Sequence, residues 1–178
     1  MAKAATARPL EAAQPRIEPA LKLKFLSHGT LESADLDRTR DFYEQFLGLE
    51  VLRTSPVSLM IRLGGANTIA VVRNLKKTEE MPLLNHNGLD VETQEEVDAA
   101  YATVMEQKDK WNIGEVTKPL LQHGTYSFFF QDMDKNWWEI LTNPQGGYTW
   151  LFEQGGDLQG KGHQDKKFAR PGVKIADN

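Results

Sequence analysis

Three polar residues interrupt apolar segments of the chain, and all three are of types that bind metals. His28 lies in a predicted strand with Phe25, Leu26 and Leu31, His86 lies in the matching predicted strand of the second half of the chain, and Glu139 lies inside Trp137-Trp138-Glu-Ile-Leu. A carboxylate in such a segment is costly to bury unless a cation or a strong donor balances its charge. The chain has no cysteine, so a metal would bind imidazole and carboxylate. Two histidines and one carboxylate that leave the other coordination positions of the metal open are typical of non-haem Fe(II) oxygenases.

We therefore predict a metal centre formed by His28, His86 and Glu139. The alternative from the residues alone is that each histidine is hydrogen-bonded in a core and that the glutamate faces water at a sheet edge. The matching placement of the three residues favours the metal centre. The chain divides into two similar halves. Each histidine lies in the first predicted strand of its own half, and the glutamate lies in the last predicted strand of the second half.

The elements that would position these residues repeat along the chain. In the first half the hydrophobic pattern predicts a strand, a helix between Asp35 and Gly48, and three strands; these strands are 21–31, 49–55, 57–63 and 67–74. In the second half it predicts a helix from Thr93 to Lys108 and, again, one strand before it and three after it; these are 84–91, 112–118, 124–131 and 137–142. His28-Gly-Thr-Leu-Glu and His86-Asn-Gly-Leu-Asp occupy the same place in the two halves, which indicates an internal repeat.

The ends of the chain differ from this pattern. Residues 1–20 are rich in Ala and Pro, and we expect a flexible N-terminal arm. Residues 145–178 carry Gly and charge with scattered aromatic residues, and we expect a C-terminal tail. The domain between them should span 21–144, with module one at 21–74 and module two at 83–144.

Composition narrows the classes of partner. The net charge of −4 gives no reason to expect nucleic acid, and no apolar run approaches the length of a membrane helix. The start of the chain lacks the apolar block of a secretory signal. We therefore expect a cytoplasmic protein without a membrane or nucleic-acid partner.

The segment from Phe130 to Leu141, FQDMDKNWWEIL, resembles the closing strand of the vicinal oxygen chelate superfamily. That superfamily includes glyoxalase I, extradiol ring-cleaving dioxygenases, and the fosfomycin and bleomycin resistance proteins. The resemblance implies an α+β fold in which two paired βαβββ modules form a curled mixed sheet, a cup around a metal site. It also implies that ligands come from the first and last strands of each module, which matches His28, His86 and Glu139.

The fourth position implied by the resemblance is Ala70, which aligns with Glu139 and cannot bind a metal. Glyoxalase I would be expected to have a carboxylate there, so Ala70 argues against that activity. The three remaining ligands resemble those of the extradiol dioxygenases and of the fosfomycin resistance enzymes. The closest resemblance is to the extradiol-like members.

Four further residues are candidates for a substrate site. By resemblance, His123 is the acid/base near the metal, with an ordinary loop histidine as the alternative. The family pattern usually has a tyrosine where this chain has Phe129, and Tyr126 is a candidate substitute. Arg62 could pair with an anionic substrate, although a strand arginine more often faces solvent. Trp137 shares its face with Glu139 and is expected to line the pocket. Asp132, Asp134 and Asn136 are expected to shape a turn and not to bind calcium.

The leading hypothesis is an extradiol-type, ring-cleaving dioxygenase that uses Fe(II) and O2 on a catechol-like aromatic. Three protein ligands would leave room for two vicinal substrate oxygens and O2. The second hypothesis is a metal-dependent isomerase, lyase or transferase of the glyoxalase or fosfomycin-resistance type, with Mn(II), Zn or Ni as a Lewis acid. The third is a metal-free binding protein like the bleomycin resistance group. Because relatives pair and some exchange modules, we also expect a homodimer.

Overall fold

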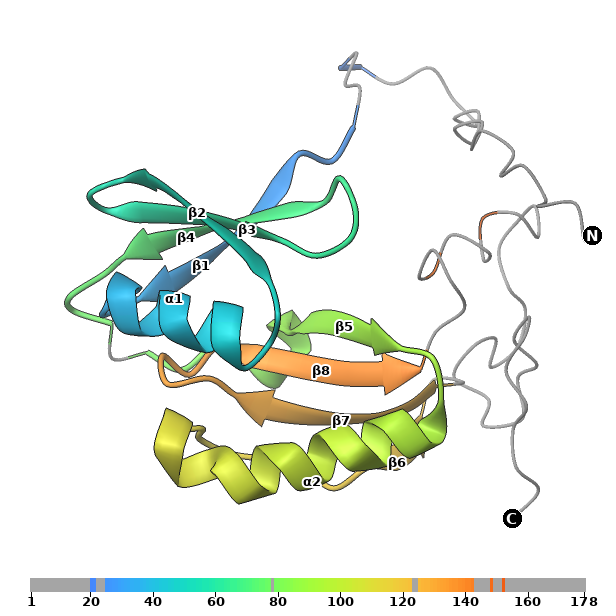
Figure 1. Cartoon of the computed structure of the whole chain (residues 1–178). Helices are drawn as coiled ribbons and strands as arrows, with labels where there is room; N and C mark the ends of the chain where they lie inside the picture. The colour runs from blue at the N-terminus through green and yellow to red at the C-terminus, as the bar shows by residue number, and fades with distance from the viewer. Residues whose placement is uncertain are drawn as a thin grey trace, which may run out of the picture.

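The computed structural model describes residues 20–21, 25–77, 79–122, 125–142, 148 and 152 (Figure 1). The predicted order of strand, helix and three strands occurs twice in this part of the chain. Module one contains β1 (His28–Ser33), α1 (Leu36–Gln45), β2 (Glu50–Ser55), β3 (Ser58–Arg62) and β4 (Thr68–Arg73). Module two contains β5 (Asn87–Val91), α2 (Gln94–Trp111), β6 (Leu120–Gln122), β7 (Thr125–Gln131) and β8 (Trp137–Thr142).

Each module forms one mixed four-stranded sheet, which confirms the predicted α+β fold of two βαβββ modules. The strand orders are β1-β4-β3-β2 and β5-β8-β7-β6. In each sheet the first and last strands of the module pair in parallel, and the other pairs are antiparallel. The first and last strands are therefore neighbours in both modules. Side chains from these two strands can thus lie beside each other on the same sheet.

Both helices begin at side-chain caps that the sequence contains. Asp35 precedes α1, and its carboxylate accepts hydrogen bonds from the backbone N–H groups of Asp37 and Arg38. Thr93 and Glu96 form a reciprocal capping box at the start of α2. After α1 the chain turns at Gly48, whose φ of 70° suits glycine. Local sequence thus sets the helix ends that bring each following strand back to its sheet.

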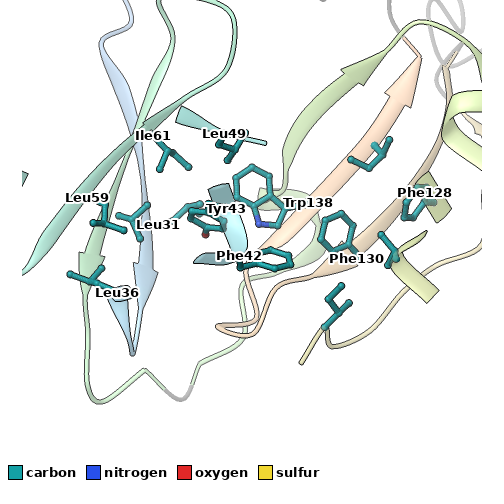
Figure 2. Packing of buried hydrophobic residues seen from close by; sticks show 14 of the residues in the cluster. Leu31, Leu36, Phe42, Tyr43, Leu49, Leu59, Ile61, Phe128, Phe130 and Trp138 are labelled. Atoms are coloured by element: carbon teal, nitrogen blue, oxygen red, sulfur yellow. The ribbon is translucent and has the colours of Figure 1, made fainter. Parts of the chain in front are cut away.

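The two sheets share one core, which Figure 2 shows from close by. Module one contributes apolar side chains from the helix-covered face of its sheet, and module two does the same from its own. Helix α1 lies between them (Figure 1), and the ring centroids of Tyr43 and Trp138 are 5.4 Å apart in an edge-to-face contact. Trp138 therefore packs toward the helices. By strand alternation, His28 and Glu139 lie on the opposite, outer faces of their sheets.

The turn between β7 and β8 is built around the buried carboxylate of Asp132. Its Oδ1 accepts hydrogen bonds from the backbone N–H groups of Asp134 and Asn136, at 2.9 and 3.0 Å. These side-chain to backbone bonds confirm that Asp132 shapes the turn, whereas the Asp134 carboxylate accepts hydrogen bonds from module one.

The same turn also joins module two to module one. Asp132 Oδ2 accepts a hydrogen bond from the Tyr43 hydroxyl at 2.9 Å, and Asp134 Oδ2 accepts one from the Thr39 hydroxyl at 2.9 Å. The Asn136 amide donates to the backbone carbonyl of Glu32 at 3.0 Å. We call this set of contacts the inter-module clamp. Together with the shared core, it holds the two modules in one arrangement.

The structure corrects three predicted boundaries. No regular strand forms at 112–118: this segment follows β7 through a single bridge at Val116 and separate backbone hydrogen bonds, and the ladder residues of β6 are Leu120–Gln122. The first strand begins at His28 and not at residue 21. His86 lies one residue before β5, at the end of a 3-10 turn (Leu83–Asn85), and not within the strand.

The proposed limits of the arm, the modules and the tail stay predictions. Residues 1–20 and 145–178 lie almost entirely outside the described residues. Within the described part of the chain, no helix has the length and apolar character needed to cross a membrane.

Candidate metal centre

His86 and Glu139 are the two predicted ligands that the structure brings together. The imidazole Nε2 of His86 lies 3.3 Å from Glu139 Oε2. Glu139 occupies the middle of β8 with only 7% of its surface exposed, and the His86 side chain is 30% exposed. The parallel partner of Glu139 on β5 is Gly88, and its antiparallel partner on β7 is Phe129. The pair therefore forms a partly open polar site on the outer face of an apolar sheet.

The hydrogen bonds of His86 determine which atom faces Glu139. Its Nδ1 lies 2.7 Å from the backbone carbonyl oxygen of Leu83. A carbonyl only accepts, so Nδ1 carries the proton and donates. In the neutral imidazole, Nε2 then presents a lone pair to a carboxylate oxygen, and two acceptors face each other. A cation between them, either a proton or a metal ion, satisfies both, and this donor set fits a divalent metal with nitrogen and oxygen ligands.

The third predicted ligand, His28, lies in module one and does not join the His86–Glu139 pair. It is the first residue of β1, it is exposed, and its Nδ1 lies 3.0 Å from the Ser27 hydroxyl. Among the residues that the structure describes, no histidine, aspartate or glutamate joins His86 and Glu139 to make a group of three. A single chain in this arrangement thus presents two of the three predicted ligands at one place and the third at another.

The strand registers of the two modules show which positions are equivalent in the internal repeat. On β1 and β4, His28 is opposite Thr68, and Thr30 is opposite Ala70. On β5 and β8, Gly88 is opposite Glu139, which extends the register to place His86 beside Trp137. Ala70 therefore occupies the position in module one that Glu139 occupies in module two, which confirms the predicted alignment. Module one provides a histidine without a carboxylate partner at this position.

Aromatic side chains surround the His86–Glu139 pair. Phe129, opposite Glu139, contacts the His86 ring edge to face with 4.8 Å between ring centroids. Trp137 is buried and shares the Glu139 face by alternation along β8. Apolar neighbours of this kind limit the access of water and strengthen the attraction between ligands and a cation.

The two predicted acid/base residues are not beside this pair in the described structure. Tyr126 lies on the face of β7 that α2 covers, and its hydroxyl donates to Asp98 Oδ1 at 2.8 Å. That hydrogen bond raises the pKa of Tyr126. Its side chain thus points away from Glu139. His123 lies outside the described residues.

Arg62 lies on the outer face of module one and already has a partner. Its Nε and a terminal nitrogen donate to Glu50 Oε2 at 3.0 and 2.7 Å, and both side chains are more than half exposed. Arg62 also lines a groove of about 530 Å³ between the β3–β4 hairpin and β5, whose apolar floor includes Ile61 and Trp138. The groove reaches Gly88 but is lined by neither His86 nor Glu139.

Sequence reasoning missed two features of the site. The first is the carbonyl of Leu83, which fixes the imidazole of His86, because a backbone group leaves no sequence signal. The second is the contact between Phe129 and His86. The alternation of β7 could have indicated this contact, because Phe129 lies on the Glu139 face when the strand is paired with β8.

Comparison with known proteins agrees with this fold. Solved structures that resemble the chain include a hypothetical protein from S. aureus, with 24% identity, a TM-score of 0.52, and coverage of 68% of this chain and 98% of that one. A possible glyoxalase from Bacillus cereus has 22% identity, a TM-score of 0.54, and coverage of 67% and 99%. A fosfomycin resistance protein from Listeria monocytogenes, solved with Mn(II) and sulfate, has 21% identity, a TM-score of 0.54, and coverage of 73% and 98%. These likenesses concern the fold.

A search of curated proteins finds no match. The sequence profile of the Glyoxalase/Bleomycin resistance protein/Dioxygenase superfamily matches residues 26–140. The matched segment includes His28, His86 and Glu139 and covers most of the chain. The protein therefore belongs to this superfamily, the vicinal oxygen chelate group that its last strand resembles.

Proposed function

We propose that the protein is a metal-dependent enzyme that cleaves the ring of a catechol-like aromatic with Fe(II) and O2. The observation that carries the proposal is the His86–Glu139 pair, in which the Nε2 lone pair faces a buried carboxylate at 3.3 Å. A proton shared by the pair would make His86 a structural residue, whereas a metal ion between the same two atoms would make it a ligand. Two acceptors turned toward each other suit a cation, and such pairs of imidazole and carboxylate are common metal ligands.

The third ligand in this proposal is His28 of a partner subunit. Two observations support a homodimer with shared sites. His28 and Glu139 lie on outer sheet faces that the shared core and the inter-module clamp keep apart within one chain. The outer face of module one also exposes Leu52, at 66%, and Val72, at 39%, which a second copy could cover. A twofold dimer would produce two equivalent centres.

The surroundings of the pair favour an aromatic substrate. Phe129 and Trp137 offer ring faces and edges near the ligands, and Arg62, the predicted partner of an anionic group, is paired with Glu50. Ala70 supplies no fourth ligand, which leaves coordination positions for a substrate with two adjacent oxygens. Aromatic side chains bind flat rings with favourable edge and offset-stacked contacts.

The residues of the chain then have distinct tasks. His86 and Glu139 bind the metal, and the Leu83 carbonyl keeps the His86 proton on Nδ1. Phe129 and Trp137 exclude water from the ligands. His123, which lies outside the described residues, is the proposed base for the substrate hydroxyl proton. Fe(II) bound by these ligands would supply the electron-transfer chemistry that O2 requires.

A specific observation favours a second candidate, a non-redox enzyme in which Mn(II), Zn or Ni acts as a Lewis acid. Phe129 occupies the position beside the ligands where the extradiol pattern has a tyrosine, so no hydroxyl is available there, and Tyr126 points toward α2. A reaction that needs no phenolic proton donor, such as an isomerisation or an epoxide opening, is compatible with this site.

Metal content and oxygen uptake distinguish the candidates. Protein purified without added metal is analysed for bound metals, loaded with Fe(II) without oxygen, mixed with a panel of catechols, and then exposed to O2. Ring cleavage predicts oxygen consumption and a yellow product, both lost in Glu139→Gln and retained in the matched control Glu106→Gln on the exposed face of α2. Bound metal without oxygen uptake overturns the dioxygenase and supports the Lewis-acid enzyme. Absence of any metal binding overturns both and leaves a metal-free binding protein.

A further inference from the structure

We propose that Phe129 is a positioning residue that holds the His86 imidazole in the orientation in which Nε2 faces Glu139. The inference rests on the proposed metal centre for its purpose, but the orientation itself exists in the chain without metal. Phe129 would act through His86 and would not bind the metal.

His86 needs such support because its backbone does not supply it. It lies between a 3-10 turn and the first residue of β5, at the end of that strand. The hydrogen bond from Nδ1 to the Leu83 carbonyl, 2.7 Å long, restrains one atom of the ring. The ring can still turn about its own Cβ–Cγ bond, which breaks this hydrogen bond and moves Nε2 away from Glu139.

The ring of Phe129 removes this freedom. Its centroid is 4.8 Å from that of His86, and the ring planes are inclined at 69°, so the two rings meet edge to face. Edge-to-face geometry is preferred by aromatic pairs and is directional, unlike contact with an aliphatic chain. The hydrogen bond to Leu83 and the aromatic contact thus restrain the imidazole from two directions.

Phe129 is itself held rigidly enough to position another residue. It is opposite Glu139 in the β7–β8 ladder and only 9% exposed. On its other side, the Phe129 N–H donates to the Thr117 hydroxyl at 2.9 Å, and the Thr117 N–H donates to the Phe129 carbonyl at 2.8 Å. The Phe129 backbone is therefore held on both sides, and its buried ring projects from the strand beside Glu139.

On the β5 side, the partner of Glu139 has no side chain. Gly88 is its neighbour on β5, and a Cβ placed there would lie 3.9 Å from Glu139 Oε2. Because Gly88 has no side chain, Phe129 is the cross-strand partner of Glu139 whose side chain can pack beside it. The orientation of His86 should depend on the ring at position 129 and not only on its volume.

The test compares variants with and without a ring. Phe129→Leu should weaken metal binding about 10- to 100-fold, the usual effect of changing a group that orients a metal ligand, whereas Phe129→Tyr keeps the ring and should weaken it less. The exposed Phe152, at 75%, provides the matched control Phe152→Leu, which should have no effect. Titration calorimetry with Mn(II) measures the affinity of the full-length protein.

A second readout needs no metal. Long-range proton–nitrogen NMR spectra of the metal-free protein, at mildly alkaline pH, should show His86 with its proton on Nδ1 in wild type and Phe129→Tyr. They should show a mixture of the two tautomers in Phe129→Leu. Phe129→Met is a second ring-free variant for use if Phe129→Leu does not fold.

Unchanged tautomers in both ring-free variants would overturn the inference, as would equal metal affinity of wild type and Phe129→Leu. If the tautomer changes as expected while wild type binds no metal, the positioning stands and the proposed function fails.

Discussion

Removing the Tyr43 hydroxyl tests whether the inter-module clamp stabilises the fold. Tyr43 is fully buried, and its hydroxyl donates to Asp132 Oδ2 at 2.9 Å. That oxygen also accepts hydrogen bonds from the Asn136 amide at 3.0 Å and from Trp138 Nε1 at 3.2 Å. Tyr43→Phe therefore removes one of several donors to a buried carboxylate without leaving the carboxylate unpaired.

The expected loss follows from the type of bond. A hydrogen bond to a charged group contributes about 1.5–3 kcal/mol to stability, and the small void left by the oxygen adds to the loss. Urea unfolding of wild type and Tyr43→Phe measures the difference. Tyr126→Phe is the matched control, because it removes a tyrosine–aspartate hydrogen bond that is exposed. The control should lose much less.

The pH dependence gives a second check on the same residue. Burial raises the pKa of Tyr43 well above its usual range, and the charge of Asp132 raises it further. The folded state thus holds this proton more tightly than the unfolded chain does. Its contribution is complete below about pH 10, the ordinary tyrosine pKa, and is lost as the pH rises. The stability difference between wild type and Tyr43→Phe should therefore shrink above that pH. Equal losses for Tyr43→Phe and Tyr126→Phe at neutral pH would refute the reasoning.

Three further predictions concern the clamp and the two outer faces. Thr39→Val removes a buried hydroxyl that donates to Asp134, and should cost about 1–3 kcal/mol in urea unfolding; a cost no larger than that of Thr103→Val, on exposed α2 surface, would contradict this. Ala70→Glu should strengthen Mn(II) binding in calorimetry, because a carboxylate then occupies the position that repeats Glu139; unchanged affinity would count against the shared centre. Arg62→Ala should leave both the unfolding midpoint and metal affinity unchanged, because the exposed pair with Glu50 contributes little; weaker metal binding would place Arg62 at the site.

The fold was predictable because its signals are local. Asp35, Gly48 and the Thr93–Glu96 box mark helix ends by their own backbone and side-chain preferences. The segment 112–118 was predicted wrongly because its pairing is irregular. Thr117 and Val116 contact β7 through separate bonds, and the continuous ladder begins only after Pro119, which has no N–H to donate.

The residue pair of the candidate site was predictable from sequence, but its assembly was not. The types and positions of His86 and Glu139 led to the pair that the structure brings together. The location of His28 depends on how the modules pack, which is set by contacts about a hundred residues apart in sequence, such as Thr39 with Asp134. No local pattern reports such contacts. Tyr126 shows the same limit at short range, because its face depends on the register of β7 against β8.

Mixing two inactive variants tests the central claim most directly. His28→Ala and Glu139→Ala chains each lack one ligand, and neither should bind Mn(II) tightly alone. If the centre joins His28 of one copy to His86 and Glu139 of another, chains unfolded together and refolded as a mixture should regain tight binding. A mixed twofold dimer then has one intact centre, or about one metal per two chains. A mixture that binds no more metal than the separate variants would contradict the shared centre.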